Sequence, residues 1–118
     1  MFMKKDRVYL RHILDAISDI ENFMRGVSQD DFFENREKQY ATLRALEIIG
    51  EATKNLSDEL KTENPSVDWK NIAGMRDKLI HAYFGVNLPL VWETVKKDLP
   101  QLKLQAQKML ENVNAEQG

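Results

Sequence analysis

The chain has 118 residues, of which 42% are hydrophobic and 31% charged, and its formal net charge is −2. This length provides one hydrophobic core, and the composition is typical of a water-soluble globular domain. The negative balance excludes nucleic-acid binding through global charge alone, so such binding would need a local basic patch.

The chain contains no cysteine, which excludes disulfides, thiolate metal sites and cysteine nucleophiles. No apolar run approaches the roughly 20 residues that a helix needs to cross a bilayer, and the first residues lack the apolar core of a signal peptide. We therefore expect one domain over residues 1–118, no membrane association and a cytoplasmic location.

The spacing of apolar residues predicts helices throughout. A first helix is predicted over residues 6 to about 26, with Asp6 in its first turn and Gly26 as its stop. Its apolar stripe comprises Leu10, Ile13, Leu14, Ile17 and Met24. Residues 28–33 predict a capped turn or one short helix.

A long helix is predicted next, over residues 36 to about 62, with Asn35 as its N-cap. Gly50 lies inside this helix, where a glycine costs about 1 kcal/mol relative to alanine. Close approach of another helix is the usual compensation, so Gly50 predicts a tight helix crossing. Pro65 disfavours helical geometry before it and should end the long helix near Glu63.

Asp68 is the expected cap of a third helix, which runs to about Phe84 and packs Trp69, Ile72 and Met75 inward. No segment shows the sustained alternation of a strand, so the helices predict an all-α fold.

A last helix is predicted from about Leu90, with Pro89 in its first turn. Pro100 lacks an amide donor and must kink or restart this helix. Together the elements predict an up-and-down bundle of four to five helices with short connections.

Four groups with useful chemistry lie close together in the third helix: Arg76, Asp77, His81 and Tyr83. At about 100° per residue, Arg76 and His81 diverge by about 140° on a straight helix and should not share a face. Asp77 and His81 do share a face, so the carboxylate could orient the imidazole. A site that uses both Arg76 and His81 therefore needs a distorted helix end or a second subunit.

An arginine and a histidine suit RNA cleavage without a metal or cofactor. The imidazole can exchange a proton with the 2′-hydroxyl or the leaving oxygen, and the guanidinium can hold the scissile phosphate. The alternative is a solvated helix face with Tyr83 as an anchor, because such side chains are common on exposed helices. The other histidine, His12, has no second ligand four residues further along the chain and is interpreted as a surface or interface residue.

At these residues the sequence resembles the HepT-like branch of the HEPN superfamily. The pattern is Arg76, four residues, His81, one residue and Tyr83. Similar surroundings extend over nearly the whole chain, in the expected order, at residues 45–52, 56–57, 69–76, 91–93 and 98–102.

The resemblance implies a HEPN-like helical homodimer that acts as a metal-independent endoribonuclease, the toxin of a toxin–antitoxin pair. It implies that Arg76 and His81 are catalytic and that Tyr83 is AMPylated by the cognate antitoxin, an MntA-like nucleotidyltransferase. AMP on Tyr83 would place bulk and negative charge beside Arg76 and exclude RNA. The role of Asp77 in orienting His81 is an inference from spacing alone.

Two other functions fit the sequence. The chain could be a non-catalytic helical partner of a nucleotidyltransferase, which the acidic balance favours because RNA would depend on local cations such as Arg76, Lys78 and Lys70. It could also be a structural bundle with a merely solvated polar face. Glu47 and Glu51 are interpreted as solvated or interface carboxylates.

Overall fold

The computed structural model describes residues 4–75, 77 and 87–117, and within these ranges every regular element is helical. In chain order the elements are α1 (Lys4–Met24), α2 (Gln29–Glu34), α3 (Arg36–Lys54), α4 (Asp58–Glu63), α5 (Trp69–Ala73), α7 (Leu88–Glu93), the π-helical turn η1 (Thr94–Asp98) and α8 (Leu99–Gln117). The predicted all-α bundle is confirmed.

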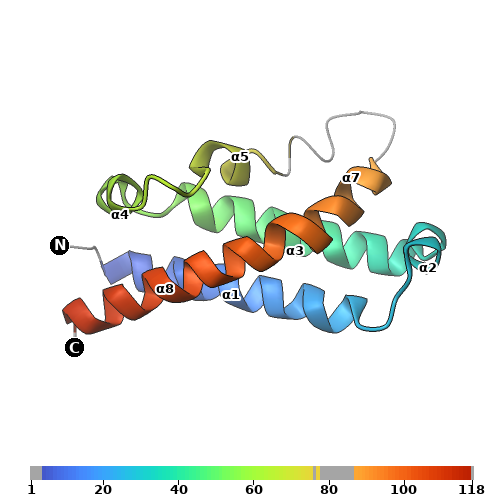
Figure 1. The fold of residues 1–118 in the computed structure, drawn as a ribbon, viewed down its shortest axis with the longest axis horizontal. Coiled ribbons are helices and arrows are strands. Elements are labelled where there is room, and N and C mark those ends of the chain that lie inside the picture. Colours follow the sequence, from blue (N-terminus) through green and yellow to red (C-terminus); the bar gives the residue numbers. More distant parts are fainter. Residues whose placement is uncertain (1–3, 76, 78–86, 118) are drawn as a thin grey trace.

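The longest helices form the body of an elongated bundle measuring 45 × 29 × 20 Å (Figure 1). Helices α1 and α3 pack along one another, and α8 packs across α1. Helix α5 lies on α3, while α2 and α4 lie at opposite ends of the bundle. The start of α1 and the end of α8 lie at the same end as α4.

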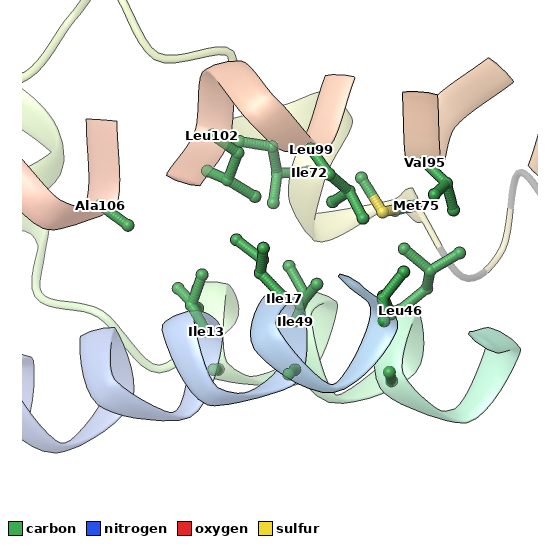
Figure 2. Packing of buried hydrophobic residues seen from close by; sticks show 14 of the residues in the cluster. Ile13, Ile17, Leu46, Ile49, Ile72, Met75, Val95, Leu99, Leu102 and Ala106 are labelled. Atoms are coloured by element: carbon green, nitrogen blue, oxygen red, sulfur yellow. The ribbon is translucent and has the colours of Figure 1, made fainter. Parts of the chain in front are cut away.

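The predicted apolar stripes meet in one core (Figure 2). Helices α1 and α3 supply one layer of side chains, and α5, η1 and α8 supply the layer that faces it. Burial of each large aliphatic side chain contributes about 1.5–3 kcal/mol. The buried residues labelled in the figure are Ile13, Ile17, Leu46, Ile49, Ile72, Met75, Val95, Leu99, Leu102 and Ala106.

Side-chain caps set the starts of several helices, as predicted. Ser28 and Asp31 form a complete capping box on α2. The side chain of Asn35 accepts a hydrogen bond from the backbone N–H of Lys38 at 3.0 Å and caps α3. Gly26 follows α1 with a φ of 72°, a conformation that favours glycine and that ends the helix.

The prediction of one long helix over residues 36–62 is wrong, because α3 ends at Lys54 and α4 begins at Asp58. Ser57 caps α4 by accepting a hydrogen bond from the N–H of Leu60 at 3.2 Å. A fully buried carboxylate, that of Asp6 in α1, accepts hydrogen bonds from the N–H of Ser57 at 2.8 Å and from its hydroxyl at 2.6 Å. This long-range contact stabilises the break.

The third predicted helix is also interrupted. Helix α5 ends at Ala73, and Gly74 caps it by donating its N–H to the carbonyl of Lys70 at 3.0 Å. Met75 and Asp77 are helical again, so the chain leaves α5 through a break rather than through a straight helix. The rest of the predicted helix, as far as Phe84, lies outside the described residues.

The last helical region begins at Leu88, two residues before the predicted start, with Pro89 in its first turn. The predicted disturbance at Pro100 is present, because the π-helical turn η1 precedes α8, in which Pro100 is the second residue. Among the residues that the structure describes, no helix has the length and apolar character needed to span a bilayer.

Candidate functional site

Helix α5 leads the chain to the Arg–His motif, and side-chain hydrogen bonds fix its start. Asp68 caps its start by accepting a hydrogen bond from the N–H of Asn71 at 3.2 Å. The indole N–H of Trp69 donates to the carbonyl of Asn64 at 3.0 Å and also reaches the carbonyl of Lys61 at 3.2 Å. These bonds hold α5 on the loop that follows α4.

Gly50 brings the backbones of α3 and α5 together, which confirms the predicted tight crossing. A Cβ atom added at Gly50 would lie 3.3 Å from the carbonyl oxygen of Ala73 and 3.6 Å from that of Ile72. Such a distance is tighter than ordinary van der Waals contact, so only glycine fits without a shift of α5. The end of α5 is therefore positioned directly by α3.

The described residues on either side of the motif have fixed surroundings. Met75, which precedes Arg76 in the sequence, is 4% exposed and contributes to the core. On the other side, the Asn87 side chain accepts a hydrogen bond from the N–H of Leu90 at 3.1 Å and caps α7. Val91 then anchors α7 in the core.

The predicted site residues Arg76, His81 and Tyr83 lie outside the described residues, so their predicted roles stay predictions. Asp77, the predicted orienting carboxylate, is helical and exposed. It lies two residues after buried Met75, so the chain turns from the core to the surface where the motif begins.

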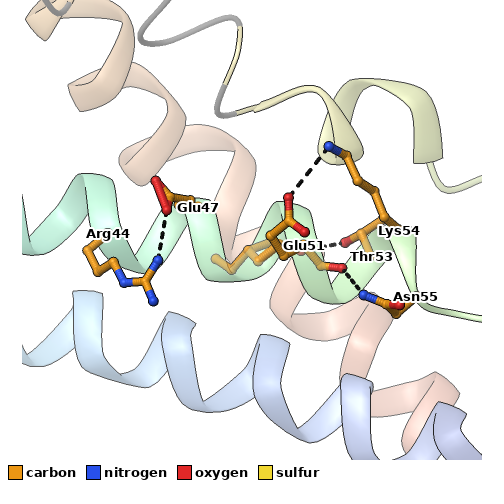
Figure 3. A network of polar contacts seen from close by, with 7 residues as sticks. Arg44, Glu47, Glu51, Thr53, Lys54 and Asn55 are labelled. Carbon is orange, nitrogen blue, oxygen red and sulfur yellow. Dashed lines mark hydrogen bonds and ion pairs between the residues drawn. The ribbon is translucent and has the colours of Figure 1, made fainter.

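The two carboxylates of α3 that we interpreted as solvated lie on one helix face and contact cations (Figure 3). A carboxylate oxygen of half-buried Glu47 is 2.7 Å from the Arg44 guanidinium, and that of exposed Glu51 is 3.6 Å from the Lys54 ammonium. Exposed pairs of this kind contribute at most about 1 kcal/mol each. These contacts fit the predicted surface role.

A second exposed feature of α3 lies near its start. The Tyr40 hydroxyl accepts a hydrogen bond from the Arg36 guanidinium at 2.7 Å, and this bond raises the pKa of Arg36 above its ordinary value. The Tyr40 side chain remains 58% exposed. The pair places a permanent cation beside an aromatic ring on the bundle surface.

His12 is exposed and packs edge-on against the Tyr9 ring, with 5.5 Å between ring centroids. This agrees with the predicted surface role. Over the described ranges, no group of three or more His, Cys, Asp or Glu side chains is arranged to hold a metal ion.

Sequence reasoning missed one cluster of cations that the fold creates. Arg25, in the turn directly after α1, lines the same cleft as Lys96 of η1 and Lys103 of α8. These residues are far apart in the sequence, and their convergence depends on the packing of α8 across α1. No local spacing could have revealed it.

The all-α fold and the Arg76–His81–Tyr83 motif point to one protein family. Residues 13–109 match the family described as "Ribonuclease HepT-like". The chain therefore belongs to the HepT-like ribonuclease family, which confirms the resemblance found in its sequence.

Relatives of nearly equal length share this similarity. A protein of Thermococcus cleftensis named "Probable ribonuclease HepT" is 48% identical over 101 residues, which cover 86% of this chain and 92% of the relative. A "Putative RNase" of Caldanaerobacter subterraneus subsp. tengcongensis is 47% identical over 109 residues, covering 92% of this chain and 97% of the relative. A "Putative RNase" of Methanocaldococcus jannaschii is 40% identical over 111 residues, covering 93% and 92%. No solved structure is significantly similar to the chain.

Proposed function

We propose that the protein is a metal-independent endoribonuclease with Arg76 and His81 as its catalytic residues. The observation that carries this proposal is the Arg76–His81–Tyr83 pattern in a chain that spans nearly the whole length of relatives named as ribonucleases. The anchored ends of the motif support it, since α5 and α7 are fixed by caps and core contacts on either side.

The proposed reaction uses groups of this chain and of the RNA. The 2′-oxygen attacks the neighbouring phosphorus, so that the O2′–P bond forms and the P–O5′ bond breaks. His81 takes the proton from the 2′-hydroxyl while water protonates the departing 5′-oxygen, or His81 protonates that oxygen while water takes the 2′-hydroxyl proton. Arg76 holds the phosphate and stabilises its developing negative charge.

Cleavage in the presence of EDTA tests this assignment. Wild-type protein should cleave RNA in EDTA, whereas His81→Ala and Arg76→Ala should each lose nearly all activity. His12→Ala and Arg11→Ala are matched controls, because they remove an exposed histidine and an exposed arginine from α1. If both motif variants cleave RNA at the wild-type rate, the assignment is wrong.

We further propose that the protein is the toxin of a toxin–antitoxin pair and that an MntA-like nucleotidyltransferase silences it. The phenolic oxygen of Tyr83 would attack the α-phosphorus of ATP, form a Tyr–AMP ester and release pyrophosphate. The added phosphate would repel the RNA phosphate from Arg76, and the adenosine would block access.

Intact mass spectrometry after co-expression with an MntA-like nucleotidyltransferase tests this regulation. Wild-type protein should gain the mass of AMP and lose RNase activity, and Tyr83→Phe should gain none. Tyr40→Phe removes a well-exposed tyrosine of α3 and should be modified like wild type. AMP found on Tyr83→Phe but not on Tyr40→Phe would move the modification to Tyr40.

A second candidate is a non-catalytic partner of a nucleotidyltransferase. The chain's net charge of −2 favours it, because an RNA-binding protein usually carries a positive balance. This function predicts a stable complex with the nucleotidyltransferase, no RNA cleavage and no growth arrest when the protein is expressed alone.

A further inference from the structure

A cleft of about 540 Å³ lies between the C-terminal end of α1 and the η1–α8 region, a size that suits a small ligand or part of a larger one. Five of the residues that line it are apolar and at most 9% exposed, and we call them its apolar floor: Ile17, Ile20, Met24, Val95 and Leu99.

The charged side chains around the cleft are mostly cations. Arg25, Lys96 and Lys103 line it together with one carboxylate, that of Glu21, so the lining has an excess of two positive charges. The chain as a whole has a net charge of −2. The cleft is therefore a local positive region on an acidic protein.

Two of these cations have no carboxylate partner among the described residues. The Lys96 ammonium lies 4.7 Å from the centroid of the Trp92 ring, a cation–π contact that holds the side chain without removing its charge. The Arg25 guanidinium donates a hydrogen bond to the neutral amide oxygen of Asn22 at 3.1 Å. Both charges remain available to an anion.

The third cation is partly neutralised. The Lys103 ammonium is 3.0 Å from Glu21, and both side chains are partly exposed. An incoming phosphate would compete with this carboxylate for the ammonium. The Glu21–Lys103 pair therefore gives the cleft a lower affinity for anions than its three cations alone would provide.

We infer that this cleft binds the sugar–phosphate backbone of the RNA strand, with a phosphate near Arg25, Lys96 and Lys103 and a ribose or base on the apolar floor. The inference rests on the proposed ribonuclease function. The supporting observation is charge complementarity between the cleft and RNA, because an acidic chain can bind RNA only where several of its cations lie together. Lys96 also belongs to the helical run that starts at Leu88 of α7, five residues after Tyr83 in the sequence.

Binding of a short single-stranded oligoribonucleotide with 2′-O-methyl groups tests the cleft. This probe lacks the attacking 2′-hydroxyl, so its binding can be measured whether or not the protein cleaves RNA. Lys96→Gln should weaken binding. It should also make the plot of log binding constant against log salt less steep, by about 0.7 in slope. Lys97→Gln is the matched control, because Lys97 lies next in η1, pairs with Glu93 at 3.4 Å and does not line the cleft. Equal effects of the two substitutions would overturn the inference.

A substitution in the opposite direction gives an independent test. Glu21→Gln releases Lys103 from its ion pair and removes the one carboxylate of the cleft, so it should strengthen binding of the same probe several-fold. Glu111→Gln removes an exposed carboxylate of α8 outside the cleft and controls for global charge. An unchanged or weaker affinity in Glu21→Gln would overturn the inference.

Two further results separate this inference from the proposed function and from a protein ligand. Wild-type protein that binds the probe through Lys96 but never cleaves RNA would refute the ribonuclease and support the cleft. If wild-type protein cleaves RNA while Lys96→Gln and Arg25→Gln bind the probe unchanged, the ribonuclease is supported and the cleft is refuted. Poly-glutamate that displaces the probe at equal charge concentration would overturn the RNA assignment in favour of an acidic polypeptide.

Discussion

Gly50 is the point where the backbone of α3 contacts the backbone of α5, and a single methyl group there has two opposing effects. Alanine would favour the helix by about 1 kcal/mol. Its Cβ would also lie 3.3 Å from the Ala73 carbonyl oxygen, which belongs to the backbone of a five-residue helix and cannot move without moving α5. The second effect should dominate, since overpacking costs about 1–3 kcal/mol.

We therefore expect Gly50→Ala to lower the free energy of unfolding by about 1 kcal/mol, as the difference between these terms, and Gly50→Val to lower it further. Urea denaturation measures both. Glu51→Ala is the control, because it alters an exposed neighbour in α3 and should change stability by less than about 0.5 kcal/mol. Gly50→Ala that is more stable than wild type would show that α5 moves freely.

Asp77 is the one predicted site residue that the structure describes, and it is a positioning residue in the proposed mechanism. If its carboxylate orients His81, Asp77→Ala should lower kcat by about 10- to 100-fold, by analogy with the loss when partners that orient metal-binding histidines are removed. Asp77→Glu retains a carboxylate and should recover most of this loss. If Asp77 has only a structural role, kcat of each variant should instead fall in proportion to its loss of stability, and the glutamate should recover no activity beyond that.

The break between α3 and α4 shows why some helix ends were predictable and others were not. Ser28, Asn35 and Asp68 were recognised as caps because they stand before apolar periodic segments. Ser57 was not recognised as a cap, because the apolar spacing of α3 continues through buried Leu56 and Leu60 and therefore predicts one uninterrupted helix. The contact that favours the break comes from Asp6 in another helix, which no local pattern reports.

This contact should contribute measurably to stability at the level of the helices that it joins. Asp6→Ala leaves the N–H and the hydroxyl of buried Ser57 without the acceptor, and we expect a loss of about 2–3 kcal/mol in the free energy of unfolding. Asp15→Ala removes an exposed carboxylate from the same helix and serves as the control. An equal shift of the urea midpoint in both variants would contradict this role.

At the scale of the whole molecule, the sequence predicted the bundle and the family, but not how separate surfaces combine. The apolar stripes were readable because helical spacing marks the buried face of each helix. The cleft between α1, η1 and α8 was not readable, because its cations meet only after α8 has packed across α1. Arg76 and His81 lie outside the described residues, so their divergence on a straight helix stays a prediction.

We propose the homodimer that the family resemblance implies, and mixed dimers can test whether Arg76 and His81 of one site come from the same chain. If each site combines Arg76 of one protomer with His81 of the partner subunit, mixing inactive Arg76→Ala and His81→Ala proteins should restore RNase activity. Random exchange makes half of the dimers mixed, each with one intact site of two, so about a quarter of wild-type activity is expected from the symmetry. No recovery after confirmed subunit exchange would place both residues of each site in one chain.

The buried carboxylate of Asp6 also bears on where the folding unit begins. The family match covers residues 13–109, yet Asp6 and Leu10 before it, and Val113 after it, are completely buried. A fragment trimmed to the matched residues would lose the start of α1, expose the core residues that it covers and leave Ser57 without its acceptor. Domain boundaries taken from the family match alone are therefore too narrow for this protein, and fragments for expression should retain residues 4–117.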